Sequence, residues 1–193
     1  MQDVTGERLT ALAATVATVL AGLSGIAAAV VFTQWDPPEA LLVVGAVLAV
    51  VAALVTAVAA WRTRDRTLLT VAVSVLAYGL SSVVPGIAIS VLVVVAQGAL
   101  LAFGVVVVRV AAGVPRVLGW TVVIAAAGWF LSLLALSTVP LVDVPQVVLD
   151  TAVSLPYLLQ AIGYLVAAAL VAVPLFRPVR TGAEHLWETA AVR

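Results

Sequence analysis

The chain has 193 residues, of which 65% are hydrophobic and 9% are charged, and its formal net charge is zero. Soluble domains contain about 45–50% apolar and about 25% charged residues, so this composition excludes a water-facing globular fold. It predicts an all-α polytopic membrane protein whose surroundings are the lipid bilayer. We expect no nucleic-acid partner.

The residue types that the chain lacks exclude several chemistries. There is no Cys, which removes disulfides, thiolate metal sites, iron–sulfur clusters and a cysteine nucleophile. There is no Lys either, so a lysine Schiff base and a P-loop are excluded. The single histidine, His185, lies in the polar C-terminal segment. We therefore expect no catalytic residues, no metal and no cofactor, and an enzyme is the least favoured class of function.

Six apolar stretches lie between polar segments, and each is long enough to cross a hydrocarbon core of about 30 Å as a helix. They cover residues 9–32, 40–61, 68–84, 87–108, 117–139 and 147–176. The third and fourth stretches must break at Pro85-Gly86, because one helix over both would be about twice as long as the core is thick. Pro followed by Gly suits a tight turn between antiparallel helices.

The pattern thus predicts three helical hairpins in a single transmembrane domain, residues 1–176, followed by a short cytoplasmic tail, residues 177–193. Cytoplasmic loops carry the excess of Arg and Lys, so the arginines predict the orientation. They fall only in alternate segments: Arg8, then Arg62, Arg64 and Arg66, then Arg109 and Arg116, then Arg177, Arg180 and Arg193. We expect both termini to be cytoplasmic, in the plasma membrane of a prokaryote.

Small residues recur at four-residue spacing on the first two predicted spans, and such stripes let membrane helices approach closely. The first stripe is Ala13, Ala17, Ala21 and Gly25, and the second is Gly45, Ala49, Ala53 and Ala57. We expect the first hairpin to pack along these two faces.

Two connections on the predicted outer side share an Asp-x-Pro-Glu/Gln pattern, at Asp36 to Glu39 and at Asp143 to Gln146. Asp as N-cap, Pro in the first turn and Glu or Gln at the third helical position are typical of a helix start. An external cation site formed by Asp36, Glu39 and Asp143 is the alternative.

The sixth span carries a polar flank that follows helical spacing. Its members are Asp150, Ser154, Tyr157, Gln160 and Tyr164. Gln97 lies at a similar depth in the fourth span, and Tyr78 lies in the outer half of the third. Our hypothesis is a ligand cleft that opens to the outside between these three spans. Its lining is Tyr78, Gln97, Asp150, Tyr157 and Gln160.

Two alternatives to the cleft stay open. The same polar groups can instead bond helix to helix, with the amides of Gln97 and Gln160 forming a pair. Asp150 can lie among lipid headgroups near the membrane surface, or it can take part in handling ions or protons.

The expected function is a non-enzymatic structural or accessory subunit that packs against another membrane protein or against copies of itself. Three inward-opening hairpins in this length resemble the short-repeat membrane proteins associated with acid stress.

The alternative function is a small-molecule transport component. In size and topology the chain resembles the substrate-binding membrane component of an energy-coupling-factor transporter. The stripe Ala13-Ala17-Ala21 resembles the small-residue face with which those components contact their partner. The resemblance implies a six-helix substrate-binding subunit. The direction of the polar flank distinguishes the two functions, because a flank facing the bundle interior favours transport and one facing lipid favours a partner interface.

Overall fold

The computed structural model describes residues 4–31, 39–84, 86–138 and 145–191, and over these residues it contains only helices, turns and short connections. For some helical residues, chiefly 4–7, 39–43 and 176–191, the backbone alone is described. The six helices are α1 (Val4–Val31), α2 (Glu39–Thr63), α3 (Arg66–Ser81), α4 (Ala88–Val110), α5 (Val114–Thr138) and α6 (Gln146–Ala191). Each apolar stretch predicted from the sequence coincides with one of these helices.

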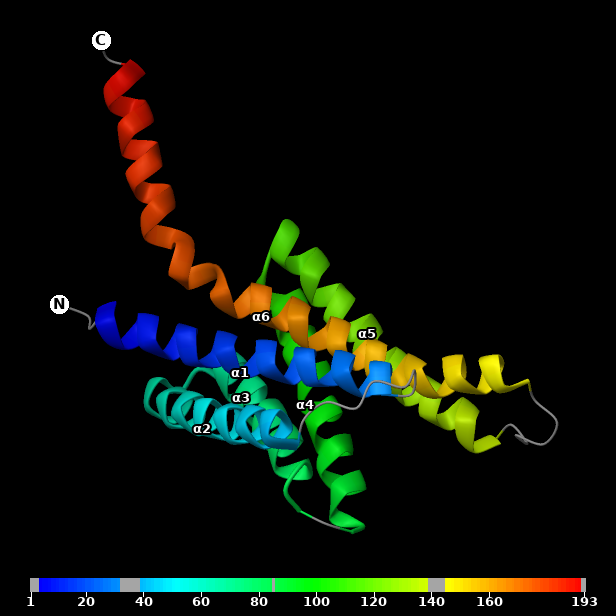
Figure 1. Cartoon of the computed structure of the whole chain (residues 1–193). Coiled ribbons are helices and arrows are strands. Elements are labelled where there is room, and N and C mark those ends of the chain that lie inside the picture. Colours follow the sequence, from blue (N-terminus) through cyan, green and yellow to red (C-terminus); the bar gives the residue numbers. More distant parts are fainter. Residues whose placement is uncertain (1–3, 32–38, 85, 139–144, 192–193) are drawn as a thin grey trace.

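The helices form a ring in which each packs against its neighbours in the chain, and α6 closes the ring by packing along α1 (Figure 1). The contact between α1 and α6 is the most extensive in the molecule. Across the ring, α1 also touches α3, and α4 touches α6. These cross-contacts bring residues of α1, α3, α4 and α6 together in the bundle interior.

Small side chains fill the interior, and large apolar side chains cover the outside. Ala14, Ala53 and Ala167 are fully buried, whereas Val51 and Leu131 are exposed. This arrangement suits a bilayer, where lipid solvates large apolar groups and helices associate through close packing of small ones. In water the same surface would form an apolar patch far larger than monomeric proteins tolerate.

Among the residues that the structure describes, four helices hold stretches long and apolar enough to cross a membrane. These stretches are Arg8–Ala29, Ala88–Val110, Val114–Thr138 and Val147–Val173. Within the described residues, α2 and α3 carry shorter apolar stretches, Val50–Arg62 and Arg66–Ser81. The fold is therefore that of an α-helical membrane protein.

The turn between α3 and α4 has the glycine conformation that the sequence predicts. Gly86 has a φ of 81°, which an L side chain rarely adopts. Its carbonyl accepts a hydrogen bond from the Ile89 amide at 3.1 Å, at the start of α4. Pro85, the other half of the predicted turn, lies outside the described residues.

Helix starts are only partly as expected. α6 begins at Gln146, directly after Pro145, whereas the Asp-x-Pro-Gln pattern predicts Pro145 in the first turn and Gln146 at the third helical position; Asp36 and Asp143 lie outside the described residues. α3 does have a side-chain N-cap: the carboxylate of Asp65 accepts hydrogen bonds from the backbone amides of Thr67 and Leu68.

The C-terminal segment after residue 176 continues α6 as far as Ala191 and points away from the bundle (Figure 1). The boundary predicted at residue 176 is therefore not the end of a helix. The ring itself contains the earlier part of α6.

The predicted small-residue stripe on α1 faces α6 at the one position whose contacts are described. Ala17 and Ala21 are buried in the interior. A Cβ atom placed on Gly25, however, would lie 3.2 Å from the Tyr157 carbonyl oxygen and 3.3 Å from the Ala161 Cβ, both on α6. At this position the stripe packs against α6, not against α2 as expected. On α2, Ala53 is buried and Ala57 half-buried, while the surroundings of Gly45 and Ala49 are outside the described part.

Candidate functional site

Polar side chains from four helices meet in the bundle interior. They are Ser24 of α1, Ser74 and Tyr78 of α3, Gln97 of α4, and Gln160 and Tyr164 of α6, and we call these six residues the polar core. Ser74, Gln97, Gln160 and Tyr164 are buried, whereas Ser24 and Tyr78 are half-buried. Polar groups in such an interior must find partners within the protein or in what it binds.

One hydrogen-bond chain joins α6, α3 and α4. The Ser74 hydroxyl donates to the Ala96 carbonyl oxygen at 2.7 Å, and it lies 2.9 Å from the Tyr164 hydroxyl. Because the single Ser74 hydrogen is directed to Ala96, the Tyr164 hydroxyl is the donor in the second bond. The hydroxyl groups of Ser74 and Tyr164 therefore both have hydrogen-bond partners.

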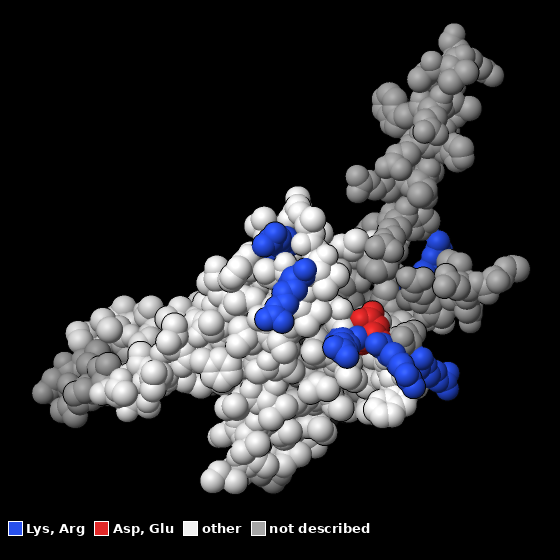
Figure 2. Space-filling model, turned by 180° about the vertical axis from the view of Figure 1, so that it is seen from behind, with Lys and Arg blue, Asp and Glu red and all other residues white. Residues whose placement is uncertain are grey.

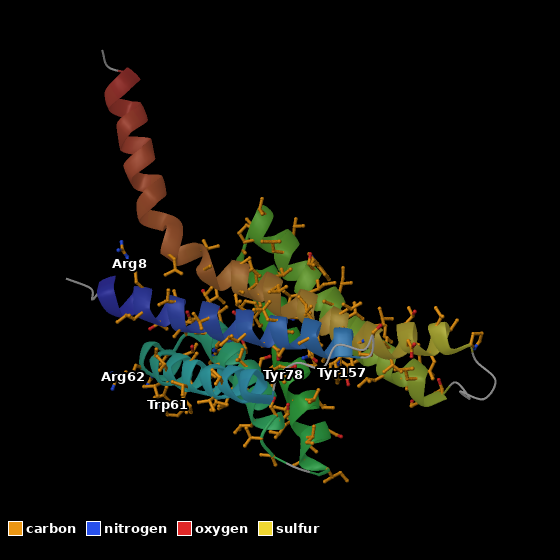
Figure 3. All side chains as sticks on the ribbon, in the orientation of Figure 1. Arg8, Trp61, Arg62, Tyr78 and Tyr157 are labelled. Carbon is orange, nitrogen blue, oxygen red and sulfur yellow. The ribbon has the colours of Figure 1, made fainter. Side chains whose placement is uncertain are left out.

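A second set of contacts joins α1, α3 and α6. The Ser24 hydroxyl donates to the Tyr78 hydroxyl at 2.9 Å, and the Gln160 side chain interacts with the same hydroxyl. The Tyr78 and Tyr164 rings lie with their centroids 5.5 Å apart, which links the two sets. Figure 3 shows Tyr78 and Tyr157 within the bundle, away from the end that carries Arg8 and Arg62.

The two glutamines are buried on helices that contact one another. A Cβ placed on Gly163 of α6 would lie 3.0 Å from Leu100 Cδ2 of α4. Gln97 and Gln160 each precede one of these contact residues by three positions. Both glutamines therefore lie about one turn before the contact between α4 and α6.

The alternative in which the polar groups bond helix to helix holds for Ser24 with Tyr78 and for Ser74 with Ala96 and Tyr164, but the amides of Gln97 and Gln160 do not form the pair that it included. Gln97 is 0% exposed and neither its Nε2 nor its Oε1 has a partner, and Nε2 of Gln160, which is 2% exposed, has none either. A buried amide without partners loses its hydration and gains nothing in return. The centre of the polar core thus contains three unsatisfied polar atoms.

The predicted cleft residues are brought together in part. Tyr78, Gln97 and Gln160 belong to the polar core, and Tyr157 lies beside Tyr78. Asp150 is half-buried but lies ten residues before Gln160 on α6, a rise of about 15 Å. Both glutamines are buried, and the outward-open cleft stays a prediction.

Three residues of the polar core were not among the predicted cleft residues. Tyr164 follows Gln160 by four positions, and Ser74 precedes Tyr78 by four, so helical spacing was the available signal for both. Ser24 carried no signal, because a serine in an alanine-rich helix is a common packing residue. Its partner, Tyr78, is 54 positions away in the sequence.

The surroundings of the polar core are neutral. Within the described part of the chain, no group of three His, Cys, Asp or Glu residues is placed to hold a metal ion. The described arginines are exposed on the surface (Figure 2). The site can therefore bind through hydrogen bonds and aromatic contact, without a charged group or metal among these side chains.

The fold and site together define an α-helical membrane protein with a buried, neutral polar core. No protein-family profile, no curated protein and no solved structure matches the chain.

Proposed function

We propose that the protein is a non-enzymatic, substrate-binding membrane component of a transport process, which holds a small polar solute in its polar core. The observation that carries this proposal is Gln97, fully buried with both amide atoms unpartnered. Leu or Met would fill the same volume at no such cost. A residue that costs stability in this way is typical of a binding site, where function outweighs local stability.

The direction of the polar flank on α6 supports the same function. Gln160 and Tyr164 are buried towards α1, α3 and α4, whereas Leu155, Leu158 and Ile162 of the same helix are exposed. The polar groups therefore face the interior, and apolar ones face the surroundings. This favours transport over the accessory role that we expected first, since a partner interface would need the polar flank on the outside.

Access to the polar core requires the helices to separate, because both glutamines are buried. Transporters commonly hold their substrate at mid-depth and expose it by moving one group of helices against another. In this bundle, α3 and α6 are joined mainly through the side chains of the polar core. Loosening these contacts would open the site without breaking the extensive backbone packing elsewhere in the ring.

The test is native mass spectrometry of the protein, extracted gently from its own membrane at its natural expression level. We expect a small molecule to be retained by the wild type and lost from a Gln160→Leu variant. A Ser137→Ala variant is the matched control, because Ser137 is exposed on α5 and bonds only to its own helix. A stoichiometric membrane-protein partner without a small molecule would instead establish the accessory role.

For topology, we propose that all six helices cross the plasma membrane of a prokaryotic cell with both termini in the cytoplasm. The arginine distribution supports this orientation. Arg8 and Arg62, from α1 and α2, lie at the same end of the bundle (Figure 3). The turn at Gly86 then faces outward, and the connection between α4 and α5 faces inward.

The absence of Cys from the chain makes this topology directly testable with single cysteines. Ile87 and Val114 are 89% and 72% exposed and lie in connections predicted on opposite sides. We expect a membrane-impermeant maleimide to label Ile87→Cys in intact cells or spheroplasts and Val114→Cys only after lysis. Ile124→Cys, exposed at the middle of α5, should resist labelling in both cases. Labelling of Val114→Cys in intact cells would refute the proposed orientation.

A further inference from the structure

The unpartnered atoms of the polar core define which hydrogen-bond donors and acceptors a bound solute must carry. Nε2 of Gln97 and Nε2 of Gln160 are donors, and Oε1 of Gln97 is an acceptor. Because both ends of the Gln97 amide lack partners, exchanging its oxygen and nitrogen leaves this requirement unchanged. A complementary solute therefore presents at least one acceptor and one donor side by side.

Charge restricts the solute further. None of the six residues of the polar core is charged, and among the described side chains every charged one is exposed except the half-buried Asp150. An ion placed beside Gln97 would lose its hydration without gaining a counter-charge, and such a transfer is strongly unfavourable. A carboxylate would also present acceptors only and would leave Oε1 of Gln97 without a donor. The site thus selects against both anions and cations.

We propose that the polar core recognises a small neutral solute bearing a carboxamide-type edge, that is, a carbonyl oxygen next to an N–H, as in a primary amide, a lactam or a urea. This inference rests on the proposed function, because it names the solute class for the same site. A Gln side chain meets such an edge with two antiparallel hydrogen bonds, as it does when it pairs with adenine. Nε2 of Gln160 supplies a further donor to the carbonyl oxygen.

The helices around Gln97 hold this amide in place for recognition. Ser74 bonds to the carbonyl of Ala96, the residue before Gln97, and thereby ties α4 to α3 and, through Tyr164, to α6. The amide is therefore carried on a part of α4 that neighbouring helices hold rigidly. A site built this way discriminates strongly against analogues that lack one of the bonding groups, because its buried polar atoms are then left unpaired.

The test uses matched pairs of amides and acids of nearly the same shape: acetamide with acetate, and nicotinamide with nicotinate. Binding to the purified full-length protein in lipid nanodiscs is measured by thermal unfolding as a function of ligand concentration, since a ligand that binds only the folded state raises the midpoint. We expect the amide of at least one pair to raise the midpoint with an apparent affinity at least about tenfold above that of its acid. The Gln97→Met variant should lose this response while retaining its helical circular dichroism spectrum.

The other outcomes separate this inference from the proposed function. If the acid of a pair binds as well as its amide or better, the protein binds solutes but the neutral amide class is wrong. If no pair responds, the mass of the molecule retained in native mass spectrometry decides. A neutral amide-bearing molecule supports the inference, and any other retained molecule overturns it. Retention of nothing at all overturns both the inference and the proposed function.

Discussion

A Gly25→Leu substitution is expected to open the ring of helices between α1 and α6. Even a Cβ at this position would lie 3.2 Å from a backbone oxygen of α6, and backbone cannot move aside as the end of a flexible side chain can. The larger side chain must push α1 away, and overpacking of this kind costs about 1–3 kcal/mol. The free energy of unfolding in bicelles should fall by the upper end of this range.

Separation of α1 from α6 should also disturb the polar core, because Ser24, the residue before Gly25, donates a hydrogen bond to the Tyr78 hydroxyl. We therefore expect the variant to lose the retained solute as well as stability. Gly98→Leu is the matched control, since nothing lies within 4 Å of a Cβ at Gly98 on α4. Equal losses of stability in the two variants would contradict the assigned contact between α1 and α6.

Replacing Gln97 with Met is expected to stabilise the protein when no solute is bound. Met has a similar length and volume but no polar atoms to leave unpaired in the interior. An unsatisfied buried polar group costs about 1–3 kcal/mol, and the variant should gain an amount of this order in the free energy of unfolding. The same variant should retain no solute, so stability and function change in opposite directions.

The Ser74→Ala variant is a control for the Gln97 variant, because it should lower the free energy of unfolding where Gln97→Met raises it. The Ser74 hydroxyl is satisfied by Ala96 and Tyr164, so its removal should lower stability by about 0.6 kcal/mol per bond, the average for such bonds between membrane helices. If Gln97→Met lowers stability in the same way, then the Gln97 amide has partners within the protein. That result would remove the basis of the proposed site.

Hydropathy alone located the helices. The ends of α2 and of α4 lie within a few residues of the predicted limits, because an apolar stretch in a bilayer must form a helix to satisfy its own backbone. The break between α3 and α4 was equally predictable, since span length demanded a turn and Gly86 supplies a positive φ. The end of α6 was not predictable, because the polar residues after 176 did not indicate that the helix continues.

The polar core was predictable in its residue types but not in its bonds. Helical spacing placed Gln160 and Tyr164 on one flank of α6, and the structure brings that flank to α3. Helical spacing did not predict that the amides of Gln97 and Gln160 do not bond to one another, because a hydrogen bond depends on angles and distances between helices that periodicity does not contain.

The class of protein, the positions of the helices and the neutral polar residues available for a site follow from the amino-acid sequence, since each depends on local composition and on the thickness of a bilayer. The packing of α6 against α1, the contact of Gly25 with α6 and the bond from Ser24 to Tyr78 became visible only in the folded bundle. They could not be predicted because small residues occur on several faces of these alanine-rich helices. Uniform hydropathy leaves the rotation of each helix undetermined until all six pack together.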